Sequence, residues 1–416
     1  MIGVATNDMG ISKSGEVKDS FARGLELRAK QTILGEGCRG SLTKTLFAKH
    51  KLRANCQHQT FGLGVKELWS VDPSKHKEGS IVHSIGYPVD TATWGGSFMY
   101  HMKDNKVALG YVVGLDYENT YLSPYQELQR LKHHPLFASV LEGGKCISYG
   151  ARTLNEGGLQ SIPKLTFPGG VLVGCTAGFL NVPKVKGTHT AMKSGMLAAE
   201  SIYDAVVNET TTSPVEVTAY ESAIKSSWVY EELHGVRNIR PSFKWGLLPF
   251  LAYSALDTYI LRGKAPWTIP VCSLPICLIH VFIFCLSFFF YQHHAPDHAC
   301  TKVRVAGGFH RQQLGHFYIF NVLYCFKKAC LTRLQPMSEC TKIDYPKPDG
   351  VLSFDLLTNL ARSGTAHEAD QPAHLKLREW KQTTDVNLPV YDGPEGRYVP
   401  LFGRIIYVCL VQLCGC

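Results

Sequence analysis

Cysteine is scarce in the first two thirds of this 416-residue sequence, and no stretch is dominated by charges of one sign. Only Cys38, Cys56, Cys146 and Cys175 precede Pro270, and so sparse a set is typical of a reducing compartment. The net charge of +9 is spread along the chain without a Lys/Arg run. We therefore expect no nucleic acid among the partners, and only a mild preference for acidic partners or anionic membranes.

Two N-terminal signals are also missing. No basic, Ser-rich leader and no apolar signal core follows Met1, so we expect no targeting peptide within this sequence. The fingerprint G-x-G-x-x-G, placed after the first strand, lets the backbone reach a dinucleotide pyrophosphate. Gly35, Gly37 and Gly40 have this spacing, but they do not follow the first strand of the chain. We expect this chain to lack the motif that holds the ADP half of a dinucleotide.

Residues 171–207 carry the strongest functional signal. A buried strand ends near Gly174, a loop follows, and a helix then begins that Thr188 or Thr190 can cap. The start of such a helix presents unpaired N–H groups to an electron-rich ligand, although packing alone explains the pattern equally well. Small side chains form one stripe of this helix, namely Ala191, Ser194, Gly195, Ala198 and Ala199.

Several long strings resemble the electron transfer flavoprotein-ubiquinone oxidoreductase family, whose members are FAD proteins of the two-dinucleotide-fold type. The longest is GCTAGFLNVPKVKGTHTAMKSGMLAAESI at residues 174–202. YGARTLNEGGLQSIPKLTFPGG at 149–170, GYPVDTATWGGSFMYHM at 86–102 and ALGYVVGLDYENTYLSP at 108–124 belong to the same family pattern. The resemblance extends over residues 2–267 and again over 334–400.

This resemblance implies a mixed α+β and α/β fold. It would be part of an FAD-binding two-dinucleotide-fold flavoprotein, with an antiparallel-sheet quinone domain and a remnant of a ferredoxin-like C-terminal domain. No catalytic acid, base or nucleophile is expected, because the flavin ring does the chemistry and the protein binds and orients it. The resemblance places Gly95 and Gly96 at ubiquinone, and it places Gly174, Cys175, Gly187, Thr188, His189, Thr190 and Met192 at FAD.

Residues 1–57 are expected to form part of the FAD-binding domain. Residues 28–34 have the composition of a strand, and a glycine-rich turn leads from it into a helix. By resemblance, Glu36, Gly37 and Arg39 lie near FAD. A tight strand-to-helix turn would explain the same glycines.

Residues 58–150 are expected to form the quinone-binding antiparallel domain. Alternating segments at 60–69, 80–88, 97–102 and 106–114 predict its strands. Between them, Gly95 and Gly96 expose bare backbone beside Trp94, where a flat ring can lie, and a β-bulge or hairpin is the alternative explanation. The family typically has tyrosine at the Trp94 position.

A single helix is predicted over residues 124–141, with His133 and His134 near its end. No third ligand lies at a suitable spacing, so we interpret this histidine pair as surface or capping residues and expect no metal site.

Residues 151–213 are expected to complete the FAD-binding domain, and residues 214–267 to form a helical, membrane-contacting segment. Residues 243–261 are apolar and aromatic and are flanked by basic side chains, as in helices that lie in a membrane surface. Gly246, Pro249 and Asp257 interrupt this stretch, which argues against a span. A buried core helix remains the alternative.

Residues 268–333 have no counterpart in the family. Residues 269–291 carry no charge, but two prolines leave only 276–291 as uninterrupted helix. The abrupt onset and the aperiodic sequence favour a translated intron over a membrane span. Four residues here could suggest zinc, but with the spacing of no standard site: His293, His294, His298 and Cys300.

Residues 334–400 resemble the family again, as the remnant of its iron-sulfur domain, and residues 401–416 form a divergent tail. In the family this domain holds a 4Fe-4S cluster on four cysteines. Here Val399 occupies the first ligand position, and Cys409, Cys414 and Cys416 lack C-x-x-C-x-x-C spacing. We expect the cluster ligands to be absent.

The expected function is electron transfer from reduced electron transfer flavoprotein, through FAD, to ubiquinone in the mitochondrial inner membrane, on its matrix side. One alternative is a non-catalytic, membrane-associated remnant that holds neither FAD nor the cluster. Another is a different flavin enzyme of the same fold, such as a monooxygenase or a prenyl reductase, which would not be expected to share the quinone-site string.

Overall fold

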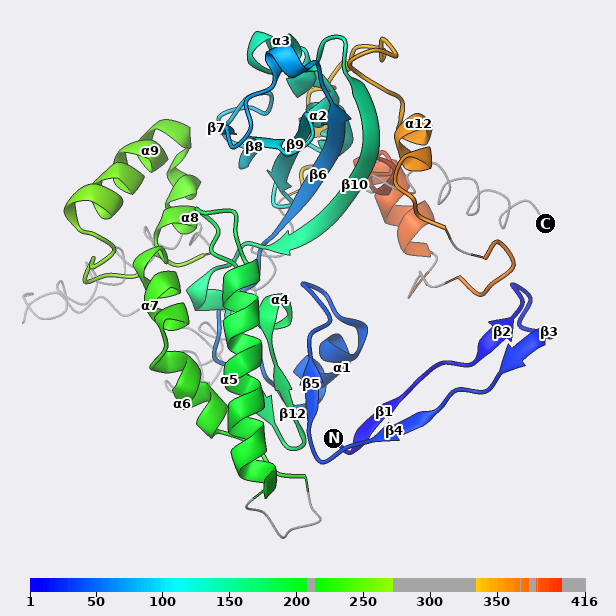
Figure 1. The fold of residues 1–416 in the computed structure, drawn as a ribbon, viewed down its shortest axis with the longest axis vertical. Coiled ribbons are helices and arrows are strands. Elements are labelled where there is room, and N and C mark those ends of the chain that lie inside the picture. Colours follow the sequence, from blue (N-terminus) through cyan, green and yellow to red (C-terminus); the bar gives the residue numbers. More distant parts are fainter. Residues whose placement is uncertain (208–213, 272–333, 367, 374–378, 380, 399–416) are drawn as a thin grey trace, which may run out of the picture. The chain divides into compact units, whose positions relative to one another are not determined.

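A five-stranded antiparallel sheet in the strand order β10-β6-β9-β8-β7 carries the largest core of the molecule (Figure 1). The computed structural model describes residues 1–207, 214–271, 334–366, 368–373, 379 and 381–398, all within one structural unit. The five strands are β6 (Phe61–Ser70), β7 (Ile81–Ile85), β8 (Gly95–Met102), β9 (Lys106–Gly114) and β10 (Lys145–Asn155). The strands predicted in this region are therefore confirmed.

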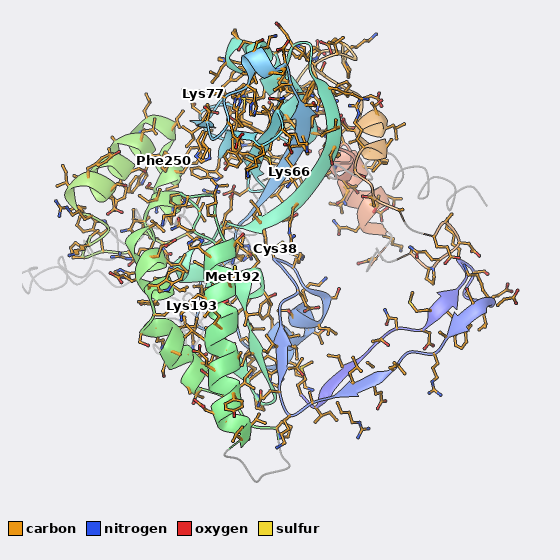
Figure 2. All side chains as sticks on the ribbon, in the orientation of Figure 1. Cys38, Lys66, Lys77, Met192, Lys193 and Phe250 are labelled. Atoms are coloured by element: carbon orange, nitrogen blue, oxygen red, sulfur yellow. The ribbon has the colours of Figure 1, made fainter. Side chains whose placement is uncertain are left out.

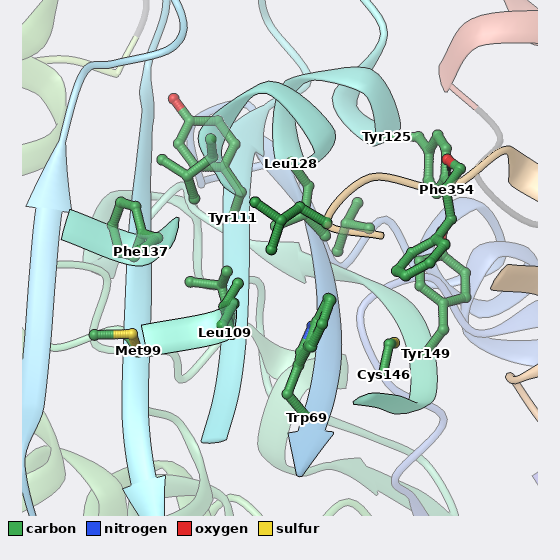
Figure 3. Close-up of a cluster of buried hydrophobic side chains, with 14 of the residues drawn as sticks. Trp69, Met99, Leu109, Tyr111, Tyr125, Leu128, Phe137, Cys146, Tyr149 and Phe354 are labelled. Carbon is green, nitrogen blue, oxygen red and sulfur yellow. Dashed lines mark hydrogen bonds between the residues drawn. The ribbon is translucent and has the colours of Figure 1, made fainter. Parts of the chain in front are cut away.

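Alternation of side chains gives this sheet its two faces. Along β6, Leu63, Val65 and Trp69 are buried, and Val65 is paired in register with Tyr111 of β9. Figure 3 shows Trp69, Leu109, Tyr111 and Leu128 converging in this core.

Two helices add to this core, where the sequence predicted one. They are α2 (Pro124–Lys132) and α3 (Pro135–Leu141). The single helix is wrong because Pro135 has no N–H to continue the first helix and instead occupies the first turn of the second. His134 caps α3, since its Nδ1 accepts from the Leu136 N–H at 3.2 Å. The capping interpretation of this histidine is confirmed.

A second, smaller sheet has the order β11-β12-β5 and contains the parallel pair typical of a dinucleotide fold. Its strands are β5 (Thr32–Leu34), β11 (Thr166–Phe167) and β12 (Gly170–Leu172). Helices α1 (Ser41–Lys49), α4 (Gly174–Ala177) and α5 (Thr188–Val207) follow these strands. The parallel pair together with the antiparallel sheet confirms the mixed α/β and α+β class.

Two local predictions in this region are wrong. The strand predicted over residues 28–34 is divided, because β4 (Glu26–Arg28) pairs with β1 (Gly3–Ala5) and only β5 joins the second sheet. The loop predicted over residues 174–187 begins with the short helix α4, which ends at Gly178 in the left-handed conformation.

The N-terminal hairpin continues from β1 and β4 into β2 (Met9–Ile11) and β3 (Val17–Ala22). Its tip touches the C-terminal part of the chain. The Lys13 N–H donates to the Asp370 carboxylate at 2.8 Å, and Lys18 forms an ion pair with Glu368.

Residues 214–271 form a series of short helices, as predicted. These are α6 (Ala219–Lys225), α7 (Trp228–Gly235), α8 (Ile239–Ser242) and α9 (Leu247–Ala255), followed by a π-helical turn at Leu256–Ile260. In the part of the chain that the structure describes, no helix combines the length and apolar character that crossing a membrane requires. Residues 276–291, for which a span was considered, lie outside the described residues.

The C-terminal part packs against the large sheet. Its helices are α12 (Leu356–Ala361), α13 (Leu388–Tyr391) and α14 (Glu395–Tyr398), with a π-helical turn at Gln382–Asn387. Short 3₁₀ turns lie at Pro73–Lys75, Leu159–Ser161, Phe243–Trp245 and Met337–Glu339.

A buried carboxylate joins the C-terminal part to the sheet. Glu67 of β6 accepts from the Lys132 ammonium at 2.9 Å and from the Asn359 amide of α12 at 2.7 Å. Trp69 and Gln129 also donate to this carboxylate, at 2.9 and 3.2 Å. A buried carboxylate surrounded by donors in this way is satisfied, so the contact fixes α12 on the sheet.

Candidate functional site

A cavity of about 360 Å³ lies between β7, β8 and α9. Gly95 and Gly96, which the resemblance placed at ubiquinone, are part of its wall, next to Trp94. Phe250 and Leu251 of α9 line another wall, and Figure 2 marks Phe250 on that helix. Leu180, Val182, Pro183 and Val185, from the loop before α5, also belong to the lining. The cavity thus has mainly apolar walls with exposed backbone at the glycine pair.

The glycine pair is required by the close approach of β8 to its neighbours. A Cβ atom at Gly96 would lie 2.5 Å from the Ser84 carbonyl oxygen of β7, and one at Gly95 would lie 2.8 Å from the Tyr111 hydroxyl. Both glycines belong to β8, where Gly95 pairs with Val113 of β9 and Gly96 pairs with Val112 of β9 and Ile85 of β7. This regular pairing excludes a hairpin at Gly95 and Gly96. Larger residues would displace β7 or Tyr111 and so deform this wall.

Trp94 closes the cavity from one end. Its ring meets Phe243 and Phe250 edge to face, with centroid separations of 5.0 and 5.4 Å. The Arg240 guanidinium lies over the same ring, 4.7 Å from its centroid. These contacts hold the indole in place and leave its N–H available to a neighbouring acceptor.

That acceptor is Glu156, which the sequence analysis did not single out. Its Oε1 accepts from Trp94 Nε1 at 3.4 Å, and its Oε2 lies 3.6 Å from Arg240 Nε. Burial raises the pKa of this carboxyl to about 7, against the opposing effect of Arg240. Trp94 and Arg240 lie beside Glu156 only in the folded chain. The one local signal for Glu156 in the sequence is a carboxylate directly before a Gly-Gly pair.

A second cavity, of about 170 Å³, lies between the turn after β5 and the start of α4. Gly37 and Arg39, which the resemblance placed near FAD, line it together with Thr176. The lining also includes three further basic or titratable side chains, Lys44, Arg53 and His58. The cationic side chains in this lining favour an anionic ligand.

Glu36, from the same turn, caps the helix that follows. Its carboxylate accepts from the Leu42 and Thr43 N–H groups at 3.1 and 2.8 Å, and also from the Thr43 hydroxyl. It therefore caps the first turn of α1, where unpaired N–H groups and the helix dipole favour an anion.

The predicted flavin residues at the start of the 171–207 stretch lie close to α5. Gly174 has φ of +58°, and its N–H donates to Ser194 Oγ at 2.9 Å. A Cβ atom at Gly174 would lie 3.2 Å from the Ala191 Cβ. Ala191 and Ser194 of α5 thus lie close against Gly174 of α4, whereas Ala199 of the same stripe is exposed. Cys175 is half-buried, and burial raises the pKa of its thiol.

The remaining predicted flavin residues flank the start of α5 and point in several directions. Gly187 precedes the helix and Thr188 opens it. Thr190 is buried, and its hydroxyl donates to the Phe179 and Gly187 carbonyl oxygens, so it does not cap the helix. His189 stacks on Trp228 and contacts Glu232 at 2.8 Å, while Met192 is exposed. Figure 2 labels Met192 on α5.

Metal ligands do not gather in the described ranges. Within them, no group of three or more His, Cys, Asp or Glu side chains could hold an ion. The positions discussed for a cluster or for zinc, at residues 293–300 and 399–416, lie outside those ranges.

Comparisons with known proteins agree with this arrangement. A family model described as "ETF-QO, ubiquinone-binding" matches residues 61–154, and another, "Electron transfer flavoprotein-ubiquinone oxidoreductase, 4Fe-4S", matches residues 350–407. The chain is 47% identical over 409 residues to "Electron transfer flavoprotein-ubiquinone oxidoreductase, mitochondrial" of Dictyostelium discoideum, covering 96% of this chain and 58% of that protein. It is 49% identical over 405 residues to the protein of the same name from Bos taurus, covering 96% of this chain and 57% of the other. The chain therefore spans a little over half the length of these relatives.

Among solved structures, a geranylgeranyl bacteriochlorophyll reductase-like protein from Thermoplasma acidophilum aligns with a TM-score of 0.40 at 15% identity. The alignment covers 65% of this chain and 63% of the other.

Proposed function

Since this chain belongs to the electron transfer flavoprotein-ubiquinone oxidoreductase family, we propose that it forms the quinone-binding part of an oxidoreductase. In this proposal the enzyme passes electrons from reduced electron transfer flavoprotein through FAD to ubiquinone. The observation that carries it is the cavity of about 360 Å³, whose lining contains Gly95 and Gly96 together with the apolar side chains of Phe250 and Leu251. A flat ring can lie on the glycine backbone while an isoprenoid tail follows the apolar wall.

We propose further that FAD is held between the turn after β5 and the starts of α4 and α5. The second cavity supports this, because Gly37 and Thr176 line it and Arg39 and Lys44 give it positive charge. Bound there, FAD would carry the electrons. The residues proposed to surround it are Gly174, Cys175, Gly187, Thr188, His189, Thr190 and Met192.

An inner mitochondrial membrane location, on the matrix side, is also part of the proposal. It is supported by an exposed apolar surface on and beside α9, which we call the α9 surface, with Lys244, Arg262 and Lys264 around it. The α9 surface consists of Trp245, Leu248, Leu251, Leu256, Tyr259, Ile260 and Trp267. Leu251 also lines the large cavity, so a quinone arriving from the bilayer would meet this cavity beside the membrane.

The division into domains remains a proposal of the same kind. Residues 1–57 and 151–213 would form the FAD-binding part, 58–150 the quinone part and 214–267 the membrane-contacting part. Residues 334–400 would represent the ferredoxin-like part, with 268–333 as an insertion and 401–416 as a divergent tail. The 4Fe-4S family model still matches the first residues of that tail.

A quinone titration tests the central proposal. Adding decylubiquinone to the full chain should quench tryptophan fluorescence, because Trp94 lines the cavity. Replacing Val112, another lining residue, by phenylalanine should weaken binding at least about tenfold, since the ring occupies the cavity. Val17→Phe, at an exposed position of β3, is the matched control and should leave the affinity unchanged. Equal affinity in both variants would contradict a site in this cavity.

A second measurement tests FAD binding by the chain itself. After incubation with FAD and gel filtration, flavin absorbance in stoichiometric amount would support the proposed cofactor site. A colourless protein would contradict it and would favour the alternative of a non-catalytic, membrane-associated chain.

A further inference from the structure

Glu156 is the one acidic side chain that lines the large cavity in the described part of the chain, and it is only 3% exposed. It follows Asn155, the last residue of β10, and lies beside Gly62 of β6. A Cβ atom at Gly62 would come within 2.3 Å of its Oε1, so the glycine makes room for the carboxyl group. The chain thus keeps a buried carboxyl group in the wall of an otherwise apolar cavity.

The hydrogen bonding of this carboxyl group is incomplete. Oε1 accepts one long bond from Trp94, and Oε2 has no hydrogen-bond partner. Arg240 offers little more, since its Nε lies 3.6 Å away and its NH2 group contacts both oxygens of Asp116 at 2.9 Å. A buried, ionised carboxylate normally has several donors. The surroundings of Glu156 therefore suit a neutral carboxyl group, which has an O–H to donate.

Reduction of a quinone to a quinol consumes two electrons and two protons. Among the lining residues only His83 and Glu156 can ionise. His83 Nε2 contacts the Tyr100 hydroxyl at 3.0 Å, and burial lowers the pKa of its imidazole. Burial thus disfavours the imidazolium form of His83, and we take Glu156 as the group that delivers a proton inside the cavity.

We propose that Glu156 hydrogen-bonds a carbonyl oxygen of the quinone in this cavity and donates one of the two protons needed for its reduction. The inference rests on the quinone-binding function proposed above. In the transfer, the carboxyl O–H bond breaks and an O–H bond forms on the quinone oxygen. Two electrons come from a reduced flavin, the second proton comes from water, and water reprotonates the carboxylate.

Two charged groups from other elements control the proton affinity of Glu156. Arg240 of α8 stabilises the carboxylate and lowers its pKa, while Asp116, after β9, repels it and raises its pKa. Burial is the largest influence and raises the pKa to about 7. Asp116 is partly exposed and pairs with Arg240, so it neutralises the cation that would otherwise hold Glu156 ionised.

Calorimetric titration of the full chain with decylubiquinone, from pH 5.5 to 8.5, tests the proposal. The dissociation constant should rise about three- to tenfold as the pH passes about 7, because an ionised Glu156 cannot donate to the quinone carbonyl. By linkage, binding near pH 7.5 should take up part of a proton, which titrations in two buffers of different ionisation enthalpy reveal.

Three variants separate Glu156 from its neighbours. Glu156→Gln keeps a donor at every pH, so its affinity should not change with pH and no proton should be taken up. His83→Gln should retain the pH dependence. Asp116→Asn should move the midpoint to lower pH, because it removes a repelling charge and frees Arg240.

Absence of quinone binding at every pH would overturn both this inference and the proposed function. Binding that does not depend on pH, or a pH dependence that survives in Glu156→Gln, would overturn the role of Glu156 alone. Circular dichroism reports whether Glu156→Gln folds. If Glu156→Gln does not fold, the test is the pH midpoint of quinone binding in Asp116→Asn compared with that of the unaltered chain. An unchanged midpoint contradicts the proposal.

Discussion

At the scale of the residue, two buried carboxyl groups differ in how many hydrogen-bond donors surround them. Glu67 and Lys132 are both fully buried and form a pair that three neutral donors complete. Glu156 is buried with far fewer donors. The first carboxylate is thus a structural group, whereas the second has protonation chemistry to offer.

Replacing Lys132 by methionine should destabilise the protein by about 3–5 kcal/mol, because it leaves the Glu67 carboxylate buried without a counter-charge. The double variant Lys132→Met, Glu67→Gln should lose much less, since no buried charge remains. Urea unfolding at pH 7 measures both. A double variant as unstable as the single one would show that the charge is not the cause.

Glu156 should make the stability depend on pH in an unusual direction. Folded, its carboxyl keeps the proton up to a pKa of about 7, whereas the unfolded carboxyl loses it near 4.5. Between these values unfolding releases protons, so the free energy of unfolding should fall by at most about 1.4 kcal/mol per pH unit and then level off. Comparing urea unfolding of the unaltered chain with that of Glu156→Gln isolates this contribution. Parallel curves for the two proteins would contradict it.

At the scale of the element, α9 has two roles on two faces. Phe250 is buried against Trp94, while Leu248 is 75% exposed and belongs to the α9 surface. A helix of a water-soluble protein would bury one face and present polar residues on the other. Here both faces are apolar, and that pattern supports contact with a bilayer.

Replacing Leu248 by glutamate should weaken binding to vesicles of phosphatidylcholine and cardiolipin by about tenfold or more. The reason is that burying a leucine side chain in an apolar phase contributes about 1.5–3 kcal/mol. Leu357→Glu is the matched control, since Leu357 of α12 is 54% exposed but lies outside the α9 surface. Sedimentation with the vesicles measures both variants. Equal losses in the two would argue against membrane contact through α9.

At the scale of the whole molecule, segments distant in sequence depend on one another. Phe354 packs on Trp69 with a centroid distance of 5.8 Å, and its N–H donates to Gln129 at 2.9 Å. Asn359 donates to Glu67 from the same segment. The C-terminal part therefore completes the core of the large sheet.

A chain that ends at residue 349 should be less stable than one that ends at residue 364, by about 3–5 kcal/mol. Only the longer chain keeps the aromatic side chain of Phe354 over Trp69 and the amide of Asn359 on Glu67. Thermal and urea unfolding of the two chains measure the difference. Matching stabilities would mean that the large sheet does not need this segment.

The sequence alone determined four strands of the large sheet, the helical character of residues 214–267 and the family to which the chain belongs, whereas β10 was not among the predicted strands. Alternation of apolar and polar side chains is a local property, so it can be read without knowing the fold. The wrong predictions, a single helix over residues 124–141 and a single strand over residues 28–34, also have local causes. Pro135 and the break between β4 and β5 divide segments whose composition is continuous.

Only the tertiary structure brought Glu156, Trp94 and Arg240 together: Glu156 follows β10, Trp94 precedes β8 and Arg240 lies in α8. Only the tertiary structure, too, placed the Thr190 hydroxyl against the Phe179 carbonyl oxygen, and Ala191 and Ser194 of α5 against Gly174. Burial, charge pairing and pKa depend on which groups meet in space, and residues separated by 62 or more positions in the chain meet only after folding. The site and its chemistry therefore belong to the fold rather than to any one motif.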